Sequence, residues 1–151
     1  KTLCWECHDN FLTTAKVKHQ PVENGECLAC HAPHAGEFKK LVKKSGAALC
    51  WDCHDDFLQV AKFQHQPAAG GDCVVCHQPH ASAFKGLLLK ADPQLCLECH
   101  EEADLNKVAS HKESGLGACL KCHDPHGGAG KLFLKPGAAK PTADNATPAA
   151  K

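Results

Sequence analysis

The 151-residue chain has the length of a single domain, yet it contains no Ile, Met or Tyr and only two Trp and six Phe, too few for a conventional core. Lys plus Arg and Asp plus Glu both number 17, so the polypeptide carries no net charge that would attract nucleic acid or an anionic membrane. No apolar run approaches the roughly 18 residues that a membrane span requires. We therefore expect something other than side chains to fill the interior.

Twelve cysteines and twelve histidines fall at fixed spacings along the chain. The cysteines form six Cys-x-x-Cys pairs that begin every 23 residues, and a histidine directly follows each pair. The full repeat is 46 residues long, because CWECH, CWDCH and CLECH alternate with CLACHAPH, CVVCHQPH and CLKCHDPH. We therefore predict three tandem units. Their bounds are 4–49, 50–95 and 96–135.

Between the two cysteine pairs of each unit the sequence predicts one short helix, because acidic residues open the segment and helix formers follow. These segments are 9–18, 55–64 and 101–110. Glycines then precede the second pair, and Pro33, Pro79 and Pro125 follow it, so regular structure is expected to stop there. We read these prolines as structural, since each forces an extended residue before it.

The predicted fold is mostly irregular, with short α-helices and no significant β-sheet. Residues 1–135 are expected to form one domain. A patch of Leu, Phe and Lys lies at the end of each of its three units. Residues 136–151 are rich in Pro, Ala and Thr and cannot form a core. We expect them to be a flexible tail or a linker, and the chain to be a processed piece of something longer.

Cys-x-x-Cys-His is the attachment sequence of c-type haem: two thiols add to the porphyrin vinyl groups, and the histidine binds the iron. Six copies in 151 residues predict six covalently attached haem c groups, which would supply the missing core. The attaching cysteines are Cys4, Cys7, Cys27, Cys30, Cys50, Cys53, Cys73, Cys76, Cys96, Cys99, Cys119 and Cys122. The motif histidines are His8, His31, His54, His77, His100 and His123.

Six more histidines lie 15 and 30 residues after the start of each unit. They are His19, His34, His65, His80, His111 and His126. Because the chain has no Met, His/Met coordination is excluded, and two histidines at every iron is the simplest arrangement. This coordination predicts reduction potentials below those of Met-ligated cytochromes.

The spacing also suggests which histidines share an iron. His31 and His34 cannot bind opposite faces of one haem, because three residues span at most about 10 Å. We therefore expect His34 to bind the iron of the first haem of its own unit and His19 to bind the iron of the second. Each unit would then supply all the iron ligands of its own two haems. In the alternative, His19 binds the first haem of its unit, and His34 reaches a neighbouring unit or another molecule.

Zinc sites and disulfides are the ordinary alternatives for paired cysteines in an exported protein. Neither explains the histidine that follows every pair, or the one further histidine for every motif. Trp5 and Trp51 inside two of the motifs are expected to pack against porphyrin, since Leu97 takes their place in the third unit.

The CxxCH motif paired with CxxCHxPH, repeated over residues 4–126, resembles the multihaem c-type cytochromes with doubled CxxCH motifs. The resemblance implies haem pairs that alternate between parallel stacking and near-perpendicular contact, and electrons that hop along them. Some relatives are periplasmic shuttles, and others polymerise into extracellular filaments. Since the sequence starts at Lys1 without an initiator Met, we expect a mature exported form.

The expected function is electron transfer to and from other redox proteins, without catalysis. Linear repetition favours a filament of copies of this chain, and a soluble periplasmic shuttle stays open as the alternative. A second alternative is a multihaem nitrite or hydroxylamine reductase. Such an enzyme needs one iron with an open position, whereas twelve histidines provide two for each of six irons.

Overall fold

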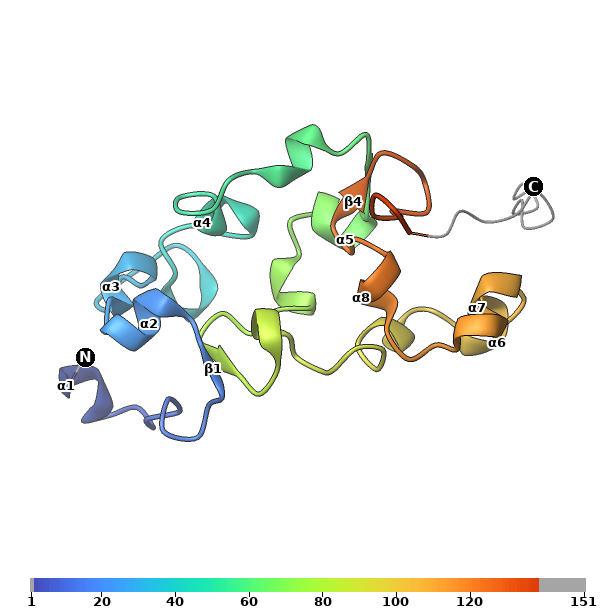
Figure 1. Cartoon of the computed structure of the whole chain (residues 1–151). Helices are drawn as coiled ribbons and strands as arrows, with labels where there is room; N and C mark the ends of the chain where they lie inside the picture. Colours follow the sequence, from blue (N-terminus) through green and yellow to red (C-terminus); the bar gives the residue numbers. More distant parts are fainter. Residues whose placement is uncertain (1, 139–151) are drawn as a thin grey trace. The chain divides into compact units, whose positions relative to one another are not determined.

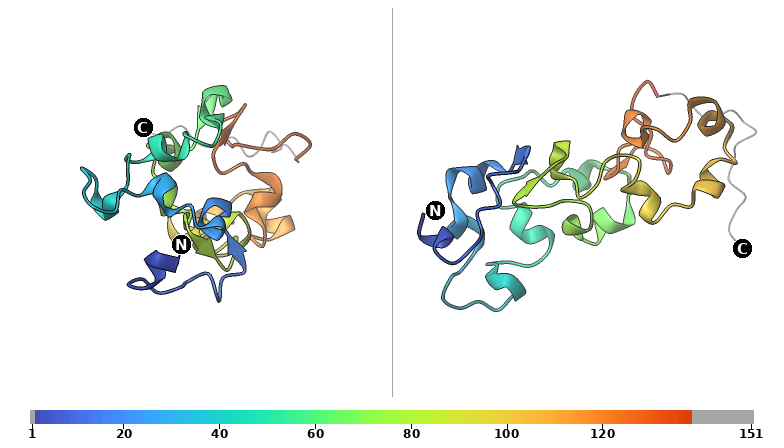
Figure 2. Two further views of the ribbon diagram at one scale, coloured as in Figure 1. Left: turned by 90° about the vertical axis from the view of Figure 1, so that its left-hand side faces the viewer. Right: turned by 90° about the horizontal axis from the view of Figure 1, so that it is seen from below.

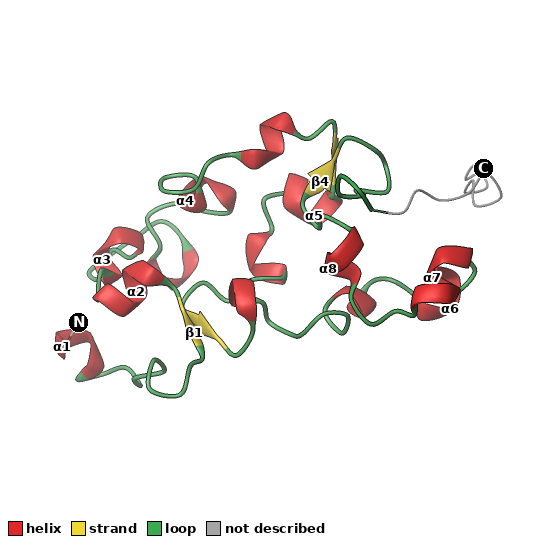
Figure 3. Cartoon of the chain, viewed as in Figure 1, coloured by secondary structure: helices red, strands yellow, loops and turns green. Residues whose placement is uncertain are grey.

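The computed structural model describes residues 2–138, in which short helices are separated by long loops (Figure 1, Figure 3). The α-helices are α1 (Thr2–Trp5), α2 (Gln20–Asn24), α3 (Cys27–Cys30), α4 (Ala47–Cys50), α5 (Gln66–Ala69), α6 (Glu102–Leu105), α7 (Ala109–Ser114) and α8 (Cys119–Cys122). The 3-10 helices are η1 (Lys39–Leu41), η2 (Phe57–Val60), η3 (Cys73–Val75), η4 (Lys85–Leu87) and η5 (Cys96–Glu98). Within this range no helix has the length and apolarity to cross a membrane.

The described residues form two compact units. One comprises residues 2–57 and 66–90, and the other comprises 58–65 and 91–138. The division crosses the 46-residue sequence repeats, because segment 58–65 belongs to the second repeat but packs with the third. The expected tail from residue 136 lies, from residue 139 on, outside the described residues.

Two small antiparallel sheets each join one repeat to the next. In the first unit β1 (Val17–Lys18) pairs with β3 (Ala81–Ser82), and in the second β2 (Phe63–Gln64) pairs with β4 (Gly127–Gly128). Each strand has two residues, so the prediction of short helices without significant sheet describes the chain in the main. Figure 2 shows the same short elements from two further directions.

The short helix predicted between the cysteine pairs is absent from 9–18, and in 55–64 it is a four-residue 3-10 helix. The first contains turns and then β1, and the second contains η2 and then β2. In the first, the Leu12 N–H donates to the Asn10 side-chain oxygen at 3.2 Å, a local bond that competes with a helix. Only 101–110 contains α-helix, namely α6 and the first two residues of α7. The first turn of α6 carries Glu102 and Asp104 at the end where the helix dipole favours acids.

A tight hairpin follows the second cysteine pair of each repeat. It is closed by single bridges from His31 to Val42, His77 to Leu88 and His123 to Leu134. Positive φ angles of 53–60° occur in these hairpins at four residues other than glycine, a conformation that side chains disfavour. Such strain is usually kept where it positions a functional group.

The polypeptide has almost no core of its own. Leu12 and Leu58, which are equivalent in the repeat, are the only buried hydrophobic side chains in the described range, each 8% exposed. Other large hydrophobic side chains are exposed, among them Leu3 at 82%, Val60 at 88% and Val74 at 63%. Large apolar surfaces are therefore left for a cofactor to cover.

Candidate functional site

One turn of backbone closes each of the six Cys-x-x-Cys-His motifs. In every motif the histidine N–H donates to the carbonyl oxygen of the first cysteine, at 2.9–3.0 Å. An i to i−4 bond of this kind brings the two ends of a five-residue motif together. Two thiols and an imidazole are thus supplied by a single turn, which is the donor set that covalent haem attachment needs.

Three motif histidines are oriented through their Nδ1 atoms. His31, His77 and His123 each bond a backbone carbonyl oxygen nine residues further on, at 3.0, 2.8 and 2.7 Å. These carbonyls belong to the strained hairpins. An imidazole that donates Nδ1–H to a carbonyl keeps its Nε2 lone pair for a metal, the usual arrangement at metal-binding histidines.

Three of the spaced histidines have the same type of bond. Nδ1 of His19 bonds the carbonyl oxygen of Pro79 at 2.9 Å, and Nδ1 of His65 bonds that of Pro125 at 2.8 Å. Nδ1 of His111 instead bonds a carbonyl oxygen of α6 at 3.0 Å. The prolines therefore have a role that the sequence analysis missed: their carbonyls orient histidines of another repeat. The constant Pro-His spacing in all three repeats was the available signal.

Eight histidines face one another in four pairs, with ring centres 5.9–6.1 Å apart. An imidazole nitrogen lies about 2.0 Å from its metal, and the ring centre about 1.1 Å behind that nitrogen, so two histidines on one metal have ring centres roughly 6 Å apart. The separations fit a bis-histidine iron site. The pairs are His19 with His54, His31 with His80, His65 with His100, and His111 with His123.

Most of these pairs differ from the expected ones. Self-contained units would place His19 against His31, but His19 faces His54 of the next repeat, and His31 faces His80. The expectation is wrong here because residues 17–19 run extended along the next repeat instead of folding back onto their own.

The third repeat follows the expected rule, since His111 faces His123 of its own unit. The expected pairing of His34 with the first haem of its unit would bring it near His8. Among residues 2–138, neither of these two rings makes a contact with another ring.

The first cysteines of the two motifs in each repeat lie side by side. These are Cys4 with Cys27, Cys50 with Cys73, and Cys96 with Cys119. Burial, followed by the neighbouring Cys73 thiol, raises the pKa of Cys50 to about 11. Burial also raises the pKa of Cys30, with a smaller electrostatic contribution from Cys53, the second cysteine of the next motif.

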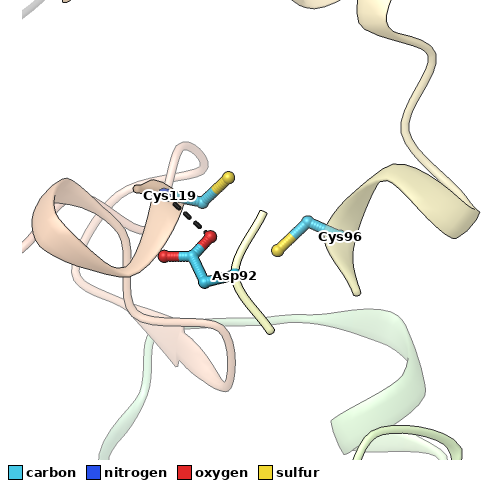
Figure 4. A group of neighbouring side chains, drawn as sticks. All are labelled: Asp92, Cys96 and Cys119. Atoms are coloured by element: carbon cyan, nitrogen blue, oxygen red, sulfur yellow. Dashed lines mark hydrogen bonds between the residues drawn. The ribbon is translucent and has the colours of Figure 1, made fainter. Parts of the chain in front are cut away.

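Asp92 lies beside one of these cysteine pairs, as Figure 4 shows. Its carboxylate accepts the backbone N–H groups of Cys119 and Leu120, both at 3.0 Å, and so caps the start of α8. Asp92, Cys96 and Cys119 offer three ligand atoms within 4.8 Å of one another. Burial and then the bond to Asp92 raise the pKa of Cys119 to about 12, and the trio has one ligand fewer than the four of a structural zinc site. The trio therefore fits a helix cap better than a zinc site.

A family model described as a doubled CXXCH motif matches the chain twice, over residues 19–59 and 65–105. Together the two matches cover more than half of the sequence. A comparison with curated proteins found no similar sequence.

Proposed function

Because the chain belongs to the doubled CXXCH motif family of multihaem c-type cytochromes, we propose that it transfers electrons along six covalently attached c-type haems, each held by two histidines. The observation that carries the proposal is the set of four histidine pairs with ring centres 5.9–6.1 Å apart. The Nδ1–H bonds to backbone carbonyls support it independently, because they leave Nε2 for the iron.

Bound haem supplies an iron that is reversibly oxidised and reduced by one electron. The twelve cysteines would attach the six groups through thioether bonds, and the twelve histidines would hold the irons, two for each iron. The four facing pairs share one iron each. We assign the same role to His8, His34, His77 and His126 from their positions in the repeat.

The cysteine contacts support an electron path in sequence order. The first cysteines of the two motifs in a repeat are neighbours, so groups attached there have adjacent edges. The electrostatic interaction of Cys30 with Cys53 supports proximity of the second and third motifs. Short spacing between successive groups is what a chain of electron carriers needs, and the 46-residue repeat extends it along the chain.

A filament of copies of this chain is our preferred context for this path, and a soluble periplasmic shuttle is the alternative. Both are exported. A reductase would require one iron without its second histidine. The supply of twelve histidines for six motifs supports an electron carrier, with other redox proteins as partners.

Haem content and coordination test the proposal on the purified protein. A pyridine haemochrome assay with an intact mass should give six haems per chain, and the oxidised protein should give only low-spin electron paramagnetic resonance signals. Replacing Cys27 and Cys30 by Ala should leave five haems. Bound zinc would overturn haem attachment, and fewer than six haems in the unaltered protein would overturn the haem count. A high-spin signal in the unaltered protein would overturn ligation of every iron by two histidines.

A further inference from the structure

Two junctions between successive repeats share one geometry. In the first, β1 pairs with β3, and the His19 N–H donates to the carbonyl oxygen of His80 at 3.0 Å. In the second, β2 pairs with β4, and the His65 N–H donates to that of His126, also at 3.0 Å. We call residues 17–19 and 63–65 donor segments, and residues 79–82 and 125–128 acceptor segments.

A third acceptor segment, residues 33–36, is supported like the others but receives no donor. The hairpin that contains it has the same hydrogen bonds as the other two. Nδ1 of His31 bonds the carbonyl oxygen of Lys40 at 3.0 Å, and the Ala32 N–H donates to that of Leu41 at 2.8 Å. From residue 2 to residue 138, no group forms a hydrogen bond with residues 33–36. The backbone of residues 33–36 and the His34 ring therefore have unused binding capacity within the described chain.

The third donor segment, residues 109–111, lies in α7 instead of a strand. His111 faces His123 with ring planes tilted by 59°, compared with 16° and 20° for the pairs that donor histidines form at the junctions. α7 has six residues, and a helix this short is marginal in water by itself. The segment can therefore become extended at small cost when a strand partner is available.

The third acceptor segment and the third donor segment match in register. At the junctions, a donor histidine faces the motif histidine 35 residues later, as His65 faces His100. An acceptor histidine faces the motif histidine 49 residues earlier, as His80 faces His31. Suppose that the repeats of a second copy follow directly after the three repeats of the first. The motif histidine 35 residues after His111 is then His8 of the second copy. The acceptor histidine that lies 49 residues after His123 is then His34 of the second copy.

We propose that the chain binds a second copy of itself head to tail, by exchanging two axial histidines. Residues 109–111 of one copy pair with residues 33–36 of the next. His111 leaves His123 and binds opposite the second copy's His8, while the second copy's His34 takes the place opposite His123. Both irons at the contact then have two histidines, so coordination is conserved. The inference rests on the bis-histidine haems proposed above and gives the filament a specific joint.

Complementation between two variants tests the exchange, using the complete haem-loaded chain. His34→Ala removes the ligand that the head of a copy supplies, and His111→Ala removes the one that the tail supplies. Lys112→Ala, in the same helix α7 but outside the donor segment, is the matched control. Mass is measured by light scattering over a concentration series, and haem content by pyridine haemochrome.

The unaltered chain and Lys112→Ala should form assemblies whose mass grows with concentration, and each histidine variant alone should stay a single chain with six haems. A mixture of the two histidine variants should form dimers, twice the mass of one chain, and stop there, because only one complete joint is available. Assembly of either variant alone, no dimers on mixing, or an unaltered chain that stays monomeric would overturn the exchange. Fewer than six haems in the unaltered chain would instead refute the proposed function.

Discussion

Gly127→Ala tests whether strand pairing between repeats places the histidines. A Cβ at Gly127 would lie 2.5 Å from the Phe63 carbonyl oxygen and 3.1 Å from both Ala61 Cβ and Gln64 Cα, at a φ of 153°. Since no L side chain fits there, β2 must move away from β4. His65 would then lose the alignment with its two acceptor carbonyls, which lie 2.8 and 3.0 Å away.

The loss of folding stability expected for Gly127→Ala follows from these contacts. Overpacking a closed site costs about 1–3 kcal/mol, and each weakened hydrogen bond of His65 adds about 1 kcal/mol. A total of about 3–5 kcal/mol should lower the melting temperature by roughly 6–20 °C in a chain of this length. Displacement of His65 should also produce a high-spin signal from one iron.

Thermal unfolding followed by circular dichroism, together with electron paramagnetic resonance of the oxidised protein, measures both effects. The matched control is Gly117→Ala, because an added Cβ there has no atom within 4 Å and φ is not positive. Equal melting temperatures for the two variants, with no high-spin signal in Gly127→Ala, would refute the role of this strand pair.

Three further predictions concern stability. Asp92→Ala should destabilise the holoprotein by about 1–2 kcal/mol through loss of the α8 cap, whereas Asp72→Ala, at a residue without a capping bond, should change little in the same melting experiment. Leu12→Ala should lower the free energy of unfolding by about 2–4 kcal/mol. The control Leu3→Ala should lower it by less than about 0.5 kcal/mol, because Leu3 is 82% exposed. Similar losses in both variants would contradict the burial of Leu12. Burial, followed by His31, His19 and Lys40, lowers the pKa of His80 below its ordinary 6.5, so the folded state binds this proton less readily than the unfolded state. This contribution to stability is complete above pH 6.5 and is lost as the pH falls through the lower folded pKa, and a melting temperature that stays constant or rises on acidification would contradict it.

The sequence predicts the chemistry of the site better than its connectivity. The spacing of cysteines and histidines identifies the donor sets, because attachment and ligation both depend on short-range geometry. The partner of His19 does not follow from spacing. Closing a loop of 35 residues to His54 costs only about 1 kcal/mol more than closing one of 12 residues to His31. The strand pairing of β1 and the two hydrogen bonds of His19 outweigh that difference.

Local propensity failed for a related reason. Residues 9–18 contain helix formers, yet Asn10 bonds the backbone of Leu12, and the segment ends in β1. The acceptor for that strand lies in the next repeat, about 60 residues away, and no window of local sequence contains it. Asp92 was missed likewise, since the backbone it caps is 27 residues further along.

The most direct test of the account is a structure of the haem-loaded protein at a resolution that shows the iron–nitrogen bonds. The account predicts one iron between His19 and His54, a second between His31 and His80, and none bound by both His19 and His31. An iron bonded to both His19 and His31, or a metal held by cysteine thiolates, would contradict it.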